Sequence, residues 1–176
     1  MNYFDFYQLP LSCQPNQDMV KQQYYANSRK FHPDRFMQAE AQEKIHALQQ
    51  AAINNEAYRT LQDPVLTLAH ILQLKGCMEA DEKFQLPASF LMEVMELNEA
   101  ISDWELGDKN PDTGAALQQQ VQQLISDLQT GIAPAMQRID EGQATDDVLL
   151  TLKEFYYKQK YLLRIKERMS IFATQD

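Results

Sequence analysis

Several features that mark common classes of protein are missing from this sequence of 176 residues. Its two cysteines, Cys13 and Cys77, are too few and too far apart for a CxxC zinc site or a disulfide framework, so we expect reduced thiols. It has no apolar run of about 18 residues, and no segment is predicted to span a membrane. The N-terminus lacks both a basic stretch with an apolar core and an Arg-rich amphipathic presequence, which predicts a cytoplasmic protein.

Positive charge and glycine are also scarce. The 16 Lys and Arg residues face 25 Asp and Glu residues, which gives a net charge of -9. Such a chain is unsuited to a general nucleic-acid surface, so we expect no nucleic-acid partner. Only 5 glycines and few β-branched runs occur, a composition that is typical of an all-α fold.

The apolar pattern predicts two helical units, residues 1–76 and 87–176, joined by an acidic linker over residues 77–86. Prolines, glycines and capping side chains set the predicted helix ends. The helices expected in the first unit cover residues 3–10, 17–31, 41–62 and 64–76, and those in the second cover residues 87–106, 113–140 and 145–172. Short loops favour antiparallel packing of the last three helices, and Pro134 is expected to kink the middle one.

The run RKFHPDRF, residues 29–36, places a histidine, a proline and an aspartate at the end of a basic helix. Pro33 fixes its own φ and has no N–H, so it stiffens the corner that presents His32 and Asp34. No acidic residue occurs over residues 19–33, which makes a positive island in an acidic chain. The cations of this island and its flank are Lys21, Arg29, Lys30 and Arg35. Such a surface favours an acidic protein partner.

Other interpretations of this corner are a capping or loop histidine, an active site and a metal site. Catalysis would need a nucleophile or a second base with an orienting partner, and none is visible, so we predict that the protein is not an enzyme. A small metal-dependent enzyme would draw its ligands from His32, Asp34, His46 and His70, whose spacing matches no common metal motif. We therefore expect neither a metal nor a cofactor, and we interpret His46 and His70 as ordinary helix residues.

Apolar spacing distinguishes core faces from a second, separate face in the predicted helices. In the 41–62 helix, the stripe predicted to face the core consists of Ala47, Leu48, Ala51, Tyr58 and Leu61. In the 87–106 helix, the core stripe consists of Phe90, Val94, Leu97, Ile101 and Trp104. Leu91, Met92 and Met95 lie about 100° to 200° away from that stripe, beside Glu96 and Glu99.

This second face is interpreted as an exposed binding patch with an acidic rim, because methionine adapts to a partner's surface. The alternative is that it packs inside the protein, against the first unit or the linker. The last helix shows a related pattern, in which the core line consists of Val148, Leu152, Phe155 and Leu162. Tyr157 and Tyr161 project elsewhere, either toward a partner or as surface tyrosines that keep only their hydroxyls in water.

The aromatic YFDFYQLP, the basic helix, the HPD tripeptide and a helix ending AYRTLQDP together resemble a J-domain. The absence of a Gly/Phe-rich stretch and of CxxC repeats is similar to the minimal class of J-proteins. The continuation, AHILQLKG and then FLMEVMELNEAISDWE, resembles the HscB family of iron–sulfur co-chaperones over nearly the whole chain. The sequence departs from the family pattern at polar Asn27 and Ser28, and at the pair Ile53-Asn54, which comes one place early.

The resemblance implies an all-α fold with an N-terminal J-domain and a C-terminal three-helix bundle in a bacterial cytoplasmic protein. It implies docking on an HscA/DnaK-type chaperone, whose ATPase it would stimulate, through the positions His32, Pro33, Asp34, Lys21, Arg29, Lys30 and Arg35. It also implies binding of an IscU-type scaffold protein through the positions Leu91, Met92, Met95, Glu96, Glu99 and Tyr157. A J-domain co-chaperone for a different client is the alternative.

Overall fold

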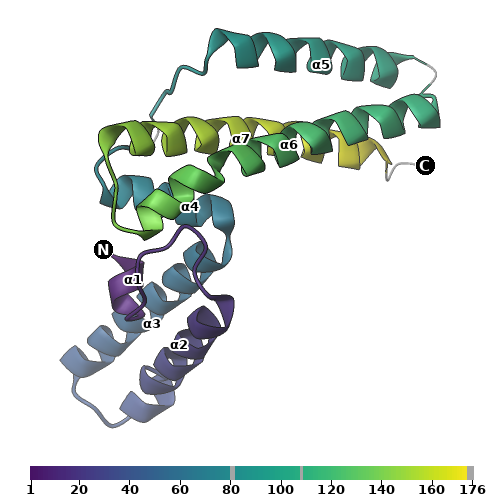
Figure 1. Ribbon diagram of the computed structural model, residues 1–176. Coiled ribbons are helices and arrows are strands. Elements are labelled where there is room, and N and C mark those ends of the chain that lie inside the picture. Colours follow the sequence, from purple (N-terminus) through teal and green to yellow (C-terminus); the bar gives the residue numbers. More distant parts are fainter. Residues whose placement is uncertain (80–81, 108, 174–176) are drawn as a thin grey trace.

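The computed structural model describes residues 1–79, 82–107 and 109–173, which leaves residues 80 and 81 of the predicted linker outside (Figure 1). Its described residues form helices and no strand, so the predicted all-α fold is confirmed. The elements are α1 (Tyr3–Phe6), α2 (Gln17–Lys30), the short 3-10 helix η1 (Pro33–Phe36), α3 (Ala41–Gln62), α4 (Pro64–Leu74), α5 (Ala88–Leu106), α6 (Pro111–Asp140) and α7 (Asp146–Ala173). Among the described residues, no helix combines the length and apolar character that crossing a membrane requires.

Local side-chain chemistry explains where the helices begin and end. Asn16 caps α2, since its Oδ1 accepts a hydrogen bond from the Met19 backbone N–H at 3.1 Å. Gly76 follows α4 with a φ of +68°, a left-handed conformation that suits glycine and ends the helix. The predicted aromatic helix over residues 3–10 is shorter than expected. Gln8 adopts a φ of +55°, which ends α1 before Pro10 is reached.

The N-terminal unit is built on an antiparallel pair, α2 and α3, with α1 packed beside α3 (Figure 1). Phe4 and Tyr7 of the N-terminal aromatic segment are buried in its core. The Tyr7 hydroxyl donates to the backbone carbonyl of Asn54 at 2.9 Å, and burial raises the pKa of Tyr7 far above its ordinary value. The aromatic segment thereby anchors the chain start against the middle of α3.

The predicted buried stripe of α3 is wrong at Leu48, whose side chain is 59% exposed. The buried positions of α3 are instead Ala47, Asn54, Ala57, Thr60 and Leu61. Leu48 lies about 100° around the helix from Ala47 and therefore leaves this line. Asn54 occupies the line because its Nδ2 donates to Ser28 Oγ at 3.0 Å and to the Tyr24 carbonyl at 3.1 Å. Two departures from the family pattern, Ser28 in α2 and Asn54 in α3, are thus hydrogen-bonded to each other.

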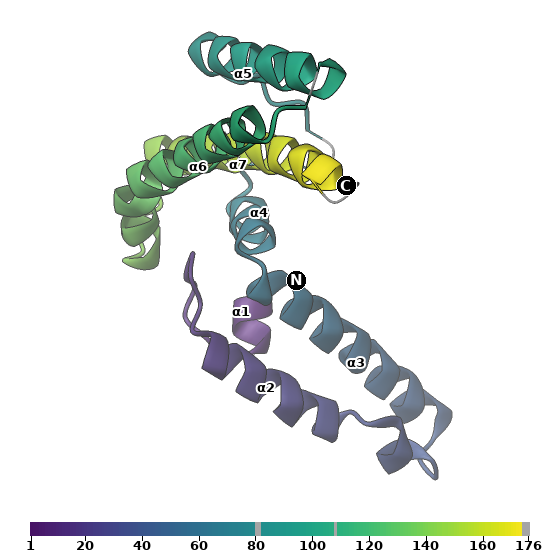
Figure 2. The same ribbon diagram turned by 90° about the vertical axis from the view of Figure 1, so that its right-hand side faces the viewer.

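The C-terminal unit is a bundle of α5, α6 and α7, in which α5 lies along the pair formed by α6 and α7 (Figure 2). Four of the five residues predicted for the α5 core stripe are buried, namely Phe90, Val94, Leu97 and Ile101, and Trp104 is half-buried. Trp104 covers Gly114, where an added Cβ would approach the indole Cζ2 to 2.7 Å. Pro134 lies inside α6, and the ribbon of α6 changes direction toward its C-terminal end (Figure 2).

Among the described residues, two buried clusters hold the molecule together, and one of them crosses from the N-terminal unit to the C-terminal helices. The crossing cluster includes Leu72 of α4 together with Ile139 of α6 and Leu152 of α7. The other cluster lies within α5, α6 and α7. Asp140 adds a polar clamp, because its carboxylate accepts hydrogen bonds from Ser12 Oγ at 2.8 Å and from the Cys13 backbone N–H at 2.7 Å. The two helical units therefore share a core.

Candidate docking surfaces

The HPD corner projects from the end of the α2–α3 pair that lies farthest from α5 (Figures 1 and 2). His32 has extended backbone angles, φ -62° and ψ 131°, as expected for a residue before proline. Its Nδ1 accepts a hydrogen bond from the Asp34 backbone N–H at 3.3 Å and lies 3.6 Å from the Asp34 carboxylate. Both side chains are exposed, so the corner presents an imidazole and a carboxylate together in a fixed local arrangement.

Cations surround this corner on one side. Arg35 is tied back to α2, since its Nη1 donates to the Arg29 carbonyl at 3.4 Å. The predicted cations Lys21, Arg29, Lys30 and Arg35 are all exposed. Two of these cations, Arg29 and Arg35, line a hollow of about 390 Å³ together with Tyr25, Ser28 and His32. The structure thus brings Arg29, Arg35 and His32 to one surface, with an aromatic side chain beside them.

A second, mostly apolar hollow, between η1 and α3, was missed by the sequence reasoning. Its volume is about 270 Å³, and its lining comprises Phe31, Pro33, Phe36, Met37, Lys44, Ala47 and Leu48. Leu48 and Met37 remain exposed there, at 59% and 71%. The signal that could have revealed this surface is the aromatic pair that flanks the tripeptide in RKFHPDRF, together with Leu48 one position beyond Ala47.

The other two histidines do not join His32. His70 lies in the core, where its Nε2 accepts a hydrogen bond from the Tyr3 backbone N–H at 3.2 Å and its ring stacks on Tyr3 at 4.3 Å. Burial, followed by the positive charge of the N-terminal amino group, lowers the pKa of His70. His46 is an exposed residue of α3. Within the described ranges, no three His, Cys, Asp or Glu side chains are grouped so that they could hold a metal ion.

The second face of α5 is open to solvent. Met92 and Met95 are 64% and 67% exposed, and Leu91 is half-buried beside them. Glu96 and Glu99 are exposed on the same helix. This resolves the alternative of internal packing, because the core stripe of α5 already covers α6 and α7. The result is a methionine patch with an acidic edge on a helix whose opposite face packs against α6 and α7.

The tyrosines of α7 contact other parts of the chain instead of standing free. The Tyr157 ring stacks on Phe84 at 4.9 Å with 9° between the planes, and its hydroxyl donates to the Glu82 carbonyl at 3.4 Å. Burial raises the pKa of Tyr157, and a hydrogen bond from Lys153 lowers the pKa of Glu82. The rings of Tyr161 and Phe90 are nearly perpendicular, with their centroids 6.1 Å apart. Tyr157 thus lies against the segment that connects the two units, whereas Met92 and Met95 face solvent.

Comparisons with known proteins agree with this architecture. A family described as the HSCB C-terminal oligomerisation domain matches residues 86–170. A co-chaperone protein HscB homolog from Psychromonas ingrahamii is 31% identical over 170 residues, which cover 96% of this chain and 99% of that relative. A second HscB homolog, from Vibrio cholerae strain ATCC 39541, is 38% identical over 102 residues. That second match spans 57% of this chain and 60% of the relative, less than two thirds of its length.

Solved structures also resemble this protein over nearly the whole chain. Chaperone HscB from Vibrio cholerae has a TM-score of 0.66 and 27% identity, and the match covers 96% of this chain and 99% of that chain. The human co-chaperone protein HscB has a TM-score of 0.80, and the match covers 99% of this chain and 83% of that chain. At 22% identity, the human protein supports the fold alone.

Proposed function

Because the chain belongs to the HscB family of co-chaperones, as its motifs predicted, we propose that it serves iron–sulfur cluster assembly in a bacterial cytoplasm. The HPD corner docks on an HscA/DnaK-type chaperone and stimulates its ATPase. The open face of α5 binds an IscU-type scaffold protein and delivers it to that chaperone. The chain supplies two binding surfaces, and ATP is hydrolysed in the partner's active site.

The observation that carries the docking role is the exposed His32–Asp34 corner at the end of a basic helix. In a chain of net charge -9, a local cluster of cations attracts an acidic partner surface and orients the encounter. Asp34 then offers the partner a hydrogen-bond acceptor at the end of this cationic surface. The rigid proline between His32 and Asp34 lowers the entropy that is lost when the corner binds.

The docking role is tested by the steady-state ATPase rate of an HscA/DnaK-type chaperone with the variant Asp34→Asn. The expected result is at least a tenfold loss of stimulation, while the fold is unchanged because the replaced carboxylate is exposed. Asp112→Asn, another exposed carboxylate, in the first turn of α6, is the matched control and should stimulate normally. Full stimulation by Asp34→Asn would contradict the docking role.

The client-binding role is supported by the exposure of Met92 and Met95 on a helix that the bundle holds rigidly. Flexible thioether side chains fit an apolar partner surface, and the exposed carboxylates of Glu96 and Glu99 favour a partner with cations around that surface. Arg168 pairs with Glu105 and donates to Ser102 Oγ at 3.1 Å, which fixes the end of α5 against α7. The patch is therefore presented without a large ordering cost.

The double variant Met92→Ala/Met95→Ala tests this face by calorimetric titration with an IscU-type scaffold protein. Removal of two central apolar contacts should weaken binding by about 10-fold to 100-fold. Basal stimulation of the chaperone ATPase, measured without scaffold protein, should stay unchanged. Leu150→Ala, an exposed aliphatic side chain on α7, is the matched control and should bind normally.

The combined measurement separates the two surfaces and the two possible clients. Chaperone ATPase should rise synergistically when wild-type protein and scaffold protein are both present. The double variant should lose only the synergy, and Asp34→Asn should lose both the basal stimulation and the synergy. If wild-type protein stimulates the ATPase but does not bind the scaffold protein, the chain is a J-domain co-chaperone for another client.

A further inference from the structure

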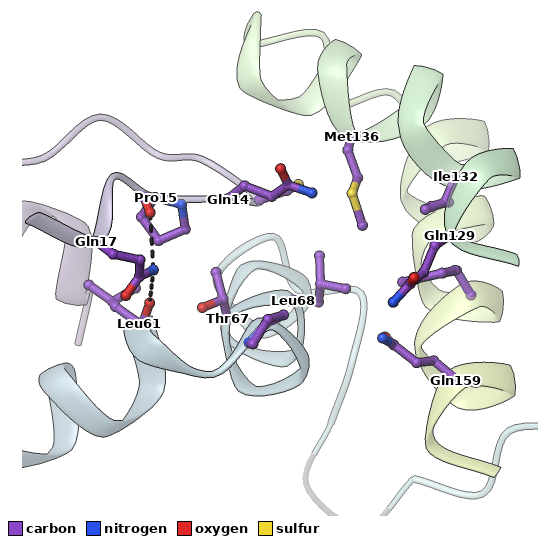
Figure 3. A pocket seen from close by; sticks show the side chains of 13 residues that line it. Gln14, Pro15, Gln17, Leu61, Thr67, Leu68, Gln129, Ile132, Met136 and Gln159 are labelled. Carbon is purple, nitrogen blue, oxygen red and sulfur yellow. Dashed lines mark hydrogen bonds between the residues drawn. The ribbon is translucent and has the colours of Figure 1, made fainter. Parts of the chain in front are cut away.

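A cleft lies at the meeting point of four parts of the chain, namely the loop that precedes α2 and the helices α4, α6 and α7 (Figure 3). It is separate from both docking surfaces. Its volume is about 380 Å³, which is in the range of small-molecule sites, and such sites are common between domains. Leu68 and Phe155 are buried parts of its wall, whereas Gln14 and Gln129 are exposed. The cleft therefore leads from an open rim to an enclosed interior.

The lining of this cleft selects against charged molecules. No Asp, Glu, Lys, Arg or His occurs among the described residues that line it. Cys13, which also lines it, is neutral at ordinary pH, because burial and then the nearby charge of Asp140 raise the pKa of its thiol to about 12. An ion would lose its hydration here without gaining an opposite charge. The occupant must therefore be uncharged.

One polar group in the cleft lacks a partner. Gln159 of α7 is only 6% exposed, and its Oε1 accepts no hydrogen bond from the described residues. Figure 3 shows the amide end of Gln159 directed into the cleft, toward Gln129. Gln17 differs, because its Nε2 donates to the carbonyls of Pro15 and Leu61, both at 3.0 Å. A buried carbonyl oxygen without a donor favours a ligand that supplies an N–H or O–H group. Because Oε1 is closed off from solvent, the ligand reaches it when a neighbouring side chain, such as the exposed Gln129, shifts aside.

We propose that this cleft binds an uncharged molecule with a cis-amide edge, such as a lactam or an imide. The ligand N–H donates to Gln159 Oε1, and the adjacent ligand carbonyl accepts from the Gln159 amide N–H, so that two amides pair side by side. The apolar ring atoms of the ligand pack against Leu68, Ile132 and Phe155. A peptide backbone fits less well, because a trans amide directs its N–H and carbonyl in opposite directions.

The test is an NMR titration of the ¹⁵N-labelled full chain with δ-valerolactam. We expect saturable shifts in the Gln159 side-chain amide and in neighbouring amides of α4 and α7. N-methyl-δ-valerolactam has nearly the same shape without the N–H and should bind at least tenfold more weakly. Gln159→Met keeps the approximate volume and removes the amide, and it should weaken δ-valerolactam binding to a similar degree.

Gln119→Met, at an exposed position of α6 outside the cleft lining, is the matched control and should bind δ-valerolactam like the wild type. Trp104 fluorescence reports whether each variant is folded, and if Gln159→Met is unfolded, the two lactams compared on the wild type decide the question. Equal binding of both lactams, equal binding by folded Gln159→Met, or no saturation up to about 50 mM would overturn the proposal. The cleft contains none of the residues of the docking surfaces, so this result is independent of the proposed function.

Discussion

The buried cluster that crosses between the two units predicts that a change in α7 will loosen the J-domain. Leu152 of α7 is fully buried in that cluster, together with Ala57 and Leu61 of α3. Leu97 of α5 is equally buried, at 2% exposure, but it belongs to the cluster within α5, α6 and α7. The substitutions Leu152→Ala and Leu97→Ala therefore remove the same atoms from two different cores.

Each substitution should lower the free energy of unfolding by about 3 kcal/mol, the usual range for a buried leucine that leaves a cavity. Where amides exchange through opening of the affected cluster, this loss accelerates exchange by about a hundredfold. Leu152→Ala should therefore accelerate exchange in α3, although α3 is distant in sequence. Leu97→Ala should accelerate exchange in α5 and shift the fluorescence of Trp104, the single tryptophan, while α3 stays protected.

Native-state hydrogen exchange followed by mass spectrometry, with peptides from α3 and α5, measures both effects in one experiment. Unchanged protection of α3 in Leu152→Ala would refute the shared core. Equal acceleration of α3 in both variants would mean that the chain unfolds as a single unit, which would contradict the separation into two clusters. Circular dichroism of each variant at 25 °C, in the same buffer, verifies that both remain folded.

Three further predictions follow from individual side chains. Asp140→Ala should lower the free energy of unfolding, measured in urea, by about 1 kcal/mol, because the Ser12 hydroxyl and the Cys13 N–H lose their acceptor. Asp140→Asn keeps one acceptor oxygen, so its free energy of unfolding should fall less. Folding favours the neutral ring of His70 and lowers its pKa below 6.5, so the stability that this residue contributes above pH 6.5 should be lost as the pH falls below that value. Urea titrations at pH 7.5 and 5.5 should therefore show a smaller change in the free energy of unfolding for His70→Gln than for the wild type. The buried Cys13 thiol, with its pKa raised to about 12, should resist iodoacetamide at neutral pH, whereas the half-buried Cys77 should be alkylated first. Mass spectrometry of the native protein measures the order of alkylation, and rapid alkylation of Cys13 would contradict its burial.

The sequence predicted the helices well because their ends depend on local chemistry. Asn16, Pro64 and Gly76 act through neighbours within a few residues, so their effects can be read without a fold. The α5 core stripe was equally accessible, since its regular spacing defines one face of a helix. The same argument predicted Met92 and Met95 on another face, although only the packed bundle shows that this face is open.

The errors and omissions concern contacts between distant segments. Leu48 satisfied the apolar pattern of α3, but the line that α2 covers passes through Asn54, whose Nδ2 donates to Ser28 and to the backbone carbonyl of Tyr24. No spacing rule assigns a buried asparagine to a core before its hydrogen-bond partners are known. Tyr157 was expected to project away from the core, and its stacking on Phe84 depends on the path of the connecting segment.

The shared core also bears on how two binding surfaces can act together. The HPD corner and helix α5 lie at opposite ends of the molecule (Figures 1 and 2). A flexible linker alone would raise the concentration of a client near the chaperone but would leave its orientation free. Packing of α4 on α7 and the Asp140 clamp restrict that freedom, so under the proposed function a client bound to α5 would be held at a limited range of positions relative to a chaperone bound to the corner. In the proposed function, loosening this junction should therefore reduce the synergy between the partners before it reduces either binding affinity.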